Sequence, residues 1–203
     1  MHPMKAIVVG SGIVGASAAY HLIMQGADVT ILTGNSVGGL ATNASFSWIN
    51  SAAGNPRPYF EFRLKAIMDW HRLERELRGS VGCTWSGSLW WEEEMTSVYE
   101  KTEELISWGY PMRILSQSEA RNQEPGLRMH PVDSVYSELE GAASAPQMTR
   151  LLLDRAEHLG ATIRPERVLA LESTGGQITG VRTPSETIYS DEVVIAAGVS
   201  SPD

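Results

Sequence analysis

Residues 4–33 read MKAIVVGSGIVGASAAYHLIMQGADVTILT: an apolar run, a glycine-rich turn, a segment of helical periodicity and a second apolar run. Gly10, Gly12 and Gly15 have the GxGxxG spacing, and the strand and helix that this motif requires flank it. Gly10 permits the tight turn, Gly12 lets the backbone approach a pyrophosphate, and Gly15 lets the helix pack closely on the strand. The stretch therefore predicts a dinucleotide held at the N-terminus of a helix that begins near Ile13. The alternative is a glycine-rich turn that binds nothing.

The residue that closes the second predicted strand, residues 28–32, bears on how a ribose is held. Asp or Glu is usual there, because a carboxylate accepts hydrogen bonds from the ribose hydroxyls. This chain has Thr33, 18 residues after Gly15, where a distance of about 20 is expected. We expect a single hydroxyl contact from Thr33, with Asn35 or Ser36 sharing the task, or else a plain turn without a ligand. No arginine directly follows Thr33, which argues against a 2′-phosphate and thus against NADP.

Composition narrows the class of protein. The chain has 203 residues, 42% of them apolar, which is ordinary for a soluble fold with one substantial core. A formal charge of −8 without a basic run argues against a nucleic-acid partner or an anionic membrane surface. Cys83 is the only cysteine, and the five histidines are scattered singly, so we expect neither a disulfide nor a metal site. No apolar run is long enough for a membrane span and no secretory signal pattern is visible, so we expect a cytoplasmic protein.

The rest of the chain continues an α/β pattern. The small-residue stretch 34–50 either runs along a ligand or forms a surface loop. Ser116 and Glu119 predict a capping box at the start of a short helix. Helical periodicity predicts helices over 58–78, 95–108 and 147–159, and strand patterns cover 84–91, 132–139, 161–164, 167–172, 177–183, 187–189 and the VVIAAG run, 193–198.

Five motifs follow one another in a fixed order: GSGIVG, a loop ending in SFSWIN, a helix followed by GATIRPERVLALE, the hairpin GGQITGVRT, and VVIAAG. This series resembles the N-terminal portion of the FAD-dependent amino-acid oxidase family, which includes glycine oxidase, sarcosine oxidase and D-amino-acid oxidase-like enzymes. The resemblance implies a Rossmann-like FAD-binding domain with a β-meander and part of a mixed α+β substrate domain. It assigns residues 1–79 and 140–203 to a discontinuous FAD-binding domain, and residues 80–139 to a partial substrate or cap domain.

The resemblance also implies a set of cofactor-binding residues. Those at the pyrophosphate would be Gly10, Gly12, Ile13, Val14 and Gly15, with Thr33 and Gly34 at the adenosine ribose. A second group would run along the pyrophosphate toward the flavin: Ala41, Thr42, Phe46, Ser47 and Trp48. Val168 would meet the adenine through its backbone, and Gly198 would let the strand end approach the cofactor. Two residues depart from the family pattern: Thr33 replaces the usual acid, and Ser200 stands where a tryptophan is common. Because residues 34–50 contain no histidine or cysteine, we expect non-covalent FAD.

The implied activity is oxidation of the C–N bond of an amino acid or a secondary amine, by hydride transfer to the flavin. The partners would be that small-molecule substrate and a second chain, or further sequence, that completes the site. No catalytic side chain is assigned; Arg57 and Tyr59 are candidates for substrate contact, but their place beside Pro56 and Pro58 favours a role at the start of a helix. The alternatives are a non-catalytic truncated or subunit form with a nucleotide-binding fold, and an NAD-linked dehydrogenase, which the VVIAAG ending disfavours.

Overall fold

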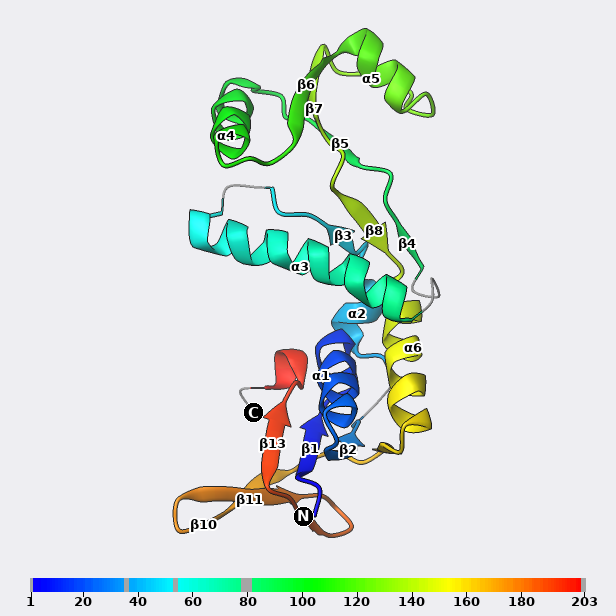
Figure 1. The fold of residues 1–203 in the computed structure, drawn as a ribbon, viewed down its shortest axis with the longest axis vertical. Helices are drawn as coiled ribbons and strands as arrows, with labels where there is room; N and C mark the ends of the chain where they lie inside the picture. The colour runs from blue at the N-terminus through cyan, green and yellow to red at the C-terminus, as the bar shows by residue number, and fades with distance from the viewer. Residues whose placement is uncertain (1, 35–36, 53–54, 78–81, 202–203) are drawn as a thin grey trace. The chain divides into compact units, whose positions relative to one another are not determined.

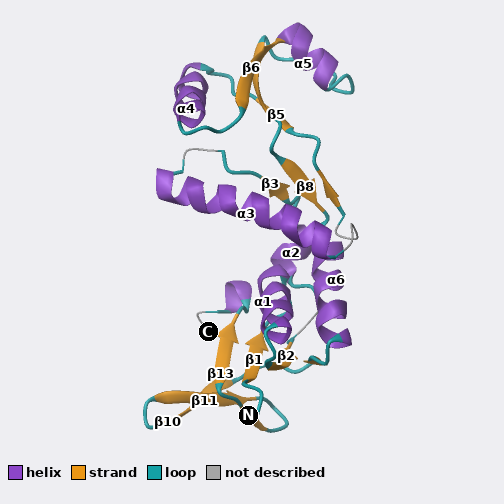
Figure 2. Ribbon diagram, viewed as in Figure 1, coloured by secondary structure: helices purple, strands orange, loops and turns teal. Residues whose placement is uncertain are grey.

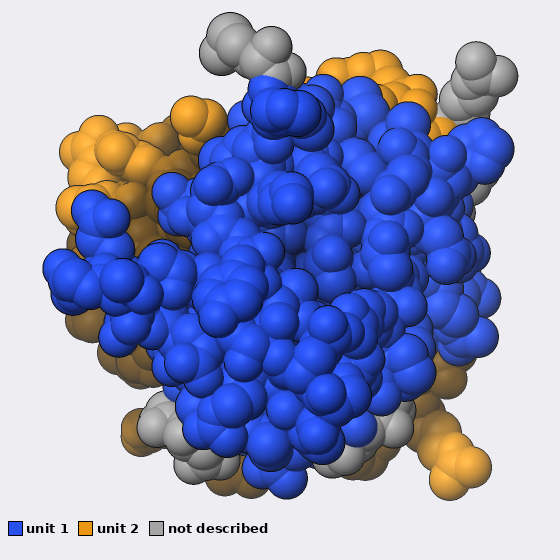
Figure 3. All heavy atoms as spheres, turned by 90° about the horizontal axis from the view of Figure 1, so that it is seen from below, with its two compact units in different colours: residues 1–46, 144–203 blue, residues 47–143 orange. Residues whose placement is uncertain are grey.

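The computed structural model describes residues 2–34, 37–52, 55–77 and 82–201, arranged as two compact units (Figure 1). Unit 1 comprises residues 1–46 and 144–203, and unit 2 comprises residues 47–143 (Figure 3). The domain bounds that the resemblance implies, 1–79 with 140–203 and 80–139, stay a prediction. The helix α3, Arg57–Glu76, has its buried residues Phe60 and Ile67 in the core of unit 2.

Unit 1 is built on a parallel sheet with the strand order β13-β1-β2-β9 (Figure 2). Its strands are β1 Lys5–Val9, β2 Asp28–Leu32, β9 Thr162–Arg164 and β13 Glu192–Ile195. The helices α1, Ile13–Met24, and α6, Ala145–His158, pack on each other. Both helices end before a glycine in the left-handed region, Gly26 at φ +87° and Gly160 at φ +109°, which glycine alone adopts at no steric cost. A short helix, α2 Leu40–Ala44, and a 3₁₀ turn, Gly198–Ser200, complete the helical elements described in this unit.

The predicted meander forms an antiparallel sheet in unit 1, with the order β10-β11-β12. Its strands are β10 Ala170–Thr174, β11 Gln177–Arg182 and β12 Thr187–Tyr189. Val181 of β11 is fully buried in one cluster with Ile7 of β1 and Leu32 of β2. The meander is therefore packed against the strands that flank the glycine turn.

Unit 2 contains two small antiparallel sheets and three helices within its described residues. The sheets have the orders β3-β8-β4 and β5-β7-β6. The strands are β3 Trp48–Ile49, β4 Cys83–Thr84, β5 Ser88–Trp90, β6 Met112–Ser116, β7 Asp133–Ser137 and β8 Gly141–Ala143. The helices are α3, α4 Thr96–Ser107 and α5 Gln117–Gln123. The prediction of one strand over 84–91 was wrong, because β4 pairs with β8 and β5 pairs with β7, in separate sheets.

The predicted capping box at the start of α5 is confirmed. The Ser116 hydroxyl accepts a hydrogen bond from the Glu119 backbone N–H, and the Glu119 carboxylate accepts one from the Ser116 backbone N–H across 2.8 Å. These bonds satisfy backbone donors that the first turn of a helix otherwise leaves unpaired.

Candidate cofactor site

A cavity of about 960 Å³ lies in unit 1 at the end of the parallel sheet. Five segments contribute to its wall: the glycine turn, the residue pair that follows β2, the start of α2, the connection into β10 and the end of β13. The lining residues are 9–14, 32–34, 39–42, 167–171 and 195–201. Ligands of doubly wound folds bind at the carboxyl ends of the parallel strands, and this is where the cavity opens.

Two glycines of the turn are required by close packing. Gly10 has φ +107°, its N–H donates to the Leu32 carbonyl across 2.8 Å, and a Cβ placed on it would lie 2.2 Å from the Ala196 oxygen. A Cβ on Gly15 would lie 2.0 Å from the Gly10 oxygen. Side chains at these positions would collide with backbone, so the turn can bring β1, β13 and α1 together only as glycine.

The loop before α2 packs against Gly12 through Gly39. A Cβ on Gly39 would lie 2.8 Å from the Gly12 Cα, and a Cβ on Gly12 would lie 3.3 Å from the Thr42 hydroxyl oxygen. That hydroxyl accepts a hydrogen bond from the Ile13 backbone N–H across 3.1 Å. The small residues of the 34–50 stretch thus let α2 approach the start of α1, and Thr42 holds the two together.

The first turn of α1 presents backbone donors to the cavity. Ile13 and Val14 line the cavity, and the side chain of Val14 is 68% exposed. Whereas the Ile13 N–H is bound to Thr42, the N–H groups of Val14 and Gly15 donate to no described residue. Free donors at the positive end of a helix dipole form an anion site suited to a pyrophosphate.

Thr33 lines the cavity but is only 5% exposed. Its hydroxyl oxygen accepts a hydrogen bond from the Ser11 hydroxyl across 2.8 Å, and the Ser11 oxygen accepts one from the Gly38 N–H. Thr33 therefore ties the end of β2 to the glycine turn in addition to facing the site. Asn35 and Ser36, which we expected to share the ribose contact, lie outside the described residues.

The rest of the cavity wall comes from residues that are distant in sequence from the glycine turn. Gly34 and Val168 both line the cavity, and so does Gly198, at φ +61°, with no atom within 4 Å of a Cβ placed on it. The sequence did not single out Arg167, Leu169 or Ala196, although all three line the same cavity. The position of Arg167 directly before Val168 was the available signal.

Of the predicted cofactor residues, Gly10, Gly12, Ile13, Val14, Thr33, Gly34, Ala41, Thr42, Val168 and Gly198 line the cavity. Gly15 lies behind the wall and is buried. Phe46 is 83% exposed and is not a lining residue. Ser47 and Trp48 belong to unit 2, so their expected contact with the cofactor stays a prediction.

In unit 2, Ser47 and Trp48 are held in a constrained corner. Ser47 has φ +56°, which is uncommon for a residue other than glycine, and its carbonyl accepts a hydrogen bond from the Ala143 N–H. The Trp48 indole N–H donates to the carboxylate of Glu140, which is fully buried. Strained backbone of this kind persists only where neighbouring contacts determine it.

Glu140 is the centre of a buried polar cluster in unit 2. Its Oε1 accepts from the Tyr110 hydroxyl across 2.8 Å, and its Oε2 accepts from the Trp48 indole and the Ser88 hydroxyl. Burial raises the pKa of Glu140, while the hydrogen bonds from Ser88, Tyr110 and Trp48 oppose that rise. Burial and the neighbouring carboxylate of Glu140 likewise raise the pKa of Tyr110.

At the start of α3, the side chain of Arg57, a candidate for substrate contact, interacts with residues of unit 2. Its guanidinium pairs with Glu61 across 3.0 Å and lies over the Trp108 ring, 5.9 Å from the centroid.

Within the described ranges, no group of three or more His, Cys, Asp or Glu side chains is arranged to hold a metal ion. None of the helices in the described part of the chain combines the length and the apolar character needed to cross a membrane.

The sequence model of the family described as DAO, FAD dependent oxidoreductase, matches residues 5–203. The chain belongs to this family. It is 30% identical to the uncharacterized oxidoreductase YurR of Bacillus subtilis (strain 168), over 95% of this chain and 54% of that protein. It is 26% identical to an opine oxidase subunit of Rhizobium meliloti, over 99% of this chain and 58% of that relative.

The fold agrees with that of a solved relative. The crystal structure of glycine oxidase from Bacillus cereus ATCC 14579 superposes with a TM-score of 0.89 at 25% identity, covering 98% of this chain and 56% of that one. The α/β architecture expected from the sequence is thereby confirmed. The chain spans between 54% and 58% of the length of these three proteins.

Proposed function

We propose that the cavity in unit 1 binds FAD without a covalent bond, and that the protein oxidises the C–N bond of an amino acid or a secondary amine. The observation that carries this proposal is the closed glycine cradle beside the free donors of α1. Side chains at Gly10 and Gly15 would collide with backbone, and the first turn of α1 keeps the N–H group of Val14 available at the cavity wall. Family membership and the likeness to glycine oxidase support the same assignment.

The residues of this chain would position the cofactor. The Val14 N–H would donate to the pyrophosphate, Thr42 would fix the start of α1, and the backbone at Val168 would meet the adenine. When bound, FAD supplies a two-electron acceptor for the hydride on the carbon beside the amine nitrogen. Leu169 and Ile195 add apolar side chains to the cavity wall.

Titration calorimetry with FAD and with NAD tests the cofactor assignment. We expect purified protein to be yellow or to take up added FAD, with a reducible flavin spectrum and weaker binding of NAD. Gly12→Ala is the informative variant, because φ −68° at Gly12 is open to any residue, while the added Cβ would lie 3.3 Å from the Thr42 hydroxyl oxygen and narrow the approach to the pyrophosphate. It should weaken FAD binding and keep the fold, whereas Gly126→Ala in unit 2 should keep both the fold and the affinity for FAD. Colourless protein that binds no added FAD would contradict the proposal.

The similarity to an opine oxidase subunit favours a second possibility, in which this chain works as one component of an assembly of unlike chains. Flavin uptake without amine oxidation by the isolated chain would support it. Amine-dependent reduction of the bound flavin in the chain alone would contradict it.

A further inference from the structure

The connection from β9 to β10, residues 165–169, supplies residues 167–169 to the cavity wall. It has no regular secondary structure, yet hydrogen bonds to the meander hold it at both ends. At one end, the Leu169 N–H donates to the Arg182 carbonyl across 2.8 Å. At the other end, the carboxylate of Glu166 makes the contacts. The position of this part of the wall therefore depends on a side chain that does not itself line the cavity.

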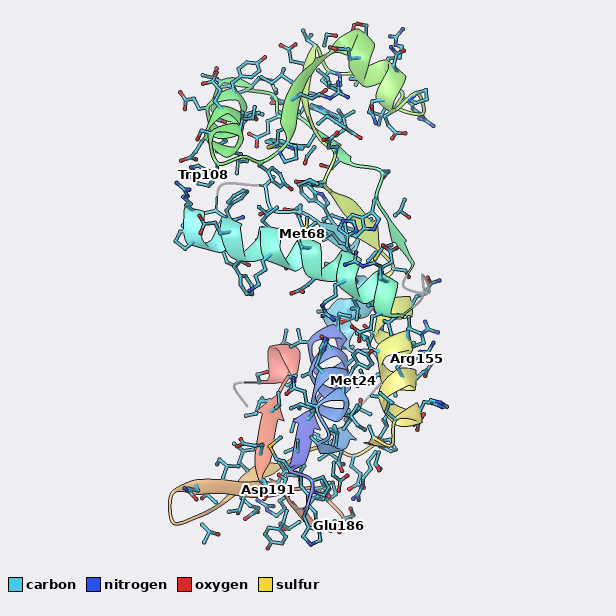
Figure 4. All side chains as sticks on the ribbon, viewed as in Figure 1. Met24, Met68, Trp108, Arg155, Glu186 and Asp191 are labelled. Carbon is cyan, nitrogen blue, oxygen red and sulfur yellow. The ribbon has the colours of Figure 1, made fainter. Side chains whose placement is uncertain are left out.

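The carboxylate of Glu166 joins this connection to the turn between β11 and β12. Its Oε1 accepts two hydrogen bonds from the guanidinium of Arg164, the one from Nε across 2.9 Å, and its Oε2 accepts one from the Ser185 hydroxyl across 2.6 Å. Arg164 also donates to Oε1 of Glu186, labelled in Figure 4, across 2.7 Å. Within the turn, the Thr183 hydroxyl donates to the Glu186 carbonyl and accepts from the Ser185 N–H. Glu166 is thus held from two sides, by the end of β9 and by the meander.

Val168 lies between the two held ends of the connection. Its side chain packs against the buried cluster of Ile7, Leu32 and Val181, which leaves its backbone to face the cavity. Neither the N–H nor the C=O of Val168 forms a hydrogen bond with the described part of the chain. Backbone groups shielded from water are almost always paired, so this donor and acceptor on one residue indicate a ligand that offers the complementary pair.

Adenine offers such a pair on its Watson–Crick edge, where N1 accepts a hydrogen bond and the exocyclic N6 amine donates one. In hypoxanthine the two roles are exchanged, because N1 carries a hydrogen and O6 accepts. A base with the exchanged pattern would place a donor against the Val168 N–H and an acceptor against its C=O. Both groups would then stay unpaired, which lowers affinity.

We propose that Glu166 is a positioning residue for the adenine of the cofactor. Through Arg164 and Ser185 it fixes the connection so that the N–H and C=O of Val168 meet the N1 and N6 groups of the base. The inference rests on the proposed function for the placement of the adenine. Glu166 acts on the ligand only through the backbone of Val168, so its effect should appear as selectivity for the base.

The test compares adenosine 5′-monophosphate with inosine 5′-monophosphate, which differ only at this edge of the base, by calorimetry on the purified chain at neutral pH. We expect the adenosine nucleotide to bind about tenfold more tightly, the effect of one or two hydrogen bonds. Glu166→Ala should lower this preference to about twofold, because the released connection no longer presents both backbone groups together. Glu166→Gln, which keeps the length of the side chain and one acceptor oxygen, should retain more of the preference than Glu166→Ala.

Glu172→Ala is the matched control, because Glu172 also forms an ion pair in the meander, with Arg182 across 3.1 Å, but does not line the cavity. It should keep the full preference. Ser185→Ala removes one of the hydrogen bonds to Glu166 at an exposed position, so it should lower the preference by a smaller factor. This variant keeps the test decisive if Glu166→Ala does not fold.

The outcomes separate this inference from the proposed function. Equal affinities of the unmodified chain for the two nucleotides, or a preference that survives both Glu166→Ala and Ser185→Ala, would overturn the inference while FAD binding still stands. An equal loss of preference in Glu172→Ala would also overturn it, since any weakening of the meander would then have the same effect. If the chain binds neither FAD nor the two nucleotides, the proposed function fails and the inference fails with it.

Discussion

The indole N–H of Trp48 donates a hydrogen bond to Oε2 of Glu140 across 2.9 Å, joining the end of the small-residue loop to the segment that leads into β8. Because Glu140 also accepts from Tyr110 and Ser88, both of its oxygens are occupied by donors inside unit 2. The buried carboxyl group of Glu140 therefore holds the backbone bend at Ser47 and Trp48 in place through the Trp48 indole.

Replacing Glu140 by Gln should destabilise the protein at neutral pH by about 1–3 kcal/mol. The amide N–H₂ would replace an oxygen that accepts hydrogen bonds, and it would then face another donor. Urea unfolding measures the change. Glu138→Gln is the control, since Glu138 is exposed and lies two residues earlier in the same segment. A Glu140→Gln protein as stable as the control would show that the cluster contributes nothing.

Gly15→Ala should lower the free energy of unfolding by at least about 2 kcal/mol, because its Cβ would lie 2.0 Å from the Gly10 oxygen and backbone must move to relieve the contact. The same urea titration checks this value. At Gly126 the only neighbour of an added Cβ among the described residues is the end of the Glu124 side chain at 3.7 Å, so Gly126→Ala should be nearly neutral. Equal stabilities of the two variants would contradict the packing role assigned to Gly15.

Thr42→Val keeps the shape of the side chain but removes the acceptor for the Ile13 N–H. We expect a loss of about 1 kcal/mol in stability and weaker FAD binding, since the start of α1 is no longer fixed. If FAD affinity is unchanged in calorimetry, the contact does not support the cofactor site.

At Thr149 on α6 the same substitution, Thr to Val, should raise the free energy of unfolding. Its hydroxyl is buried and has no hydrogen-bond partner among the described residues, so Thr149→Val removes a desolvated polar group. An increase of about 1 kcal/mol in the free energy of unfolding is expected. A clear decrease would mean that the hydroxyl is paired.

Glu166 should add an acid-sensitive contribution to stability. Hydrogen bonds from the hydroxyls of Ser185 and Thr183, and from Arg164, lower the pKa of Glu166 from 4.5 to about 2. The folded state therefore holds the proton less tightly than the unfolded chain does, so this contribution is present above pH 4.5 and is lost as the pH falls from about 4.5 to about 2. Glu166→Gln should flatten this part of the stability profile, whereas Glu157→Gln, on an exposed part of α6, should leave it unchanged.

Local signals predicted local structure well. The start of α1 at Ile13, the glycine that follows its end and the capping box at Ser116 each depend on a few adjacent residues, and each is confirmed. The division of the 84–91 strand could not be predicted in this way, because it depends on which distant strands, β8 and β7, supply the hydrogen bonds.

For the candidate site too, the residues of local motifs could be predicted, and those brought together by sheet pairing could not. The glycine turn was predicted from its motif and Val168 from the family resemblance, and the structure brings them to one cavity. Arg167 was missed because its proximity to Gly34 comes from the register between β2 and β9, which no spacing within either segment reveals. Side chains that meet only through sheet pairing require the three-dimensional structure.

The strand order of unit 1 also constrains when this protein can fold. β1 lies between β2 and β13, with Ala6 opposite Glu192, so one edge of the central strand has no partner until nearly all of these 203 residues have been synthesised. Residues 47–143 form a continuous unit and can fold earlier on the ribosome. Because pairing across such a sequence separation is slow, the edge of β1 that faces β13 stays open to wrong strand pairing until β13 emerges.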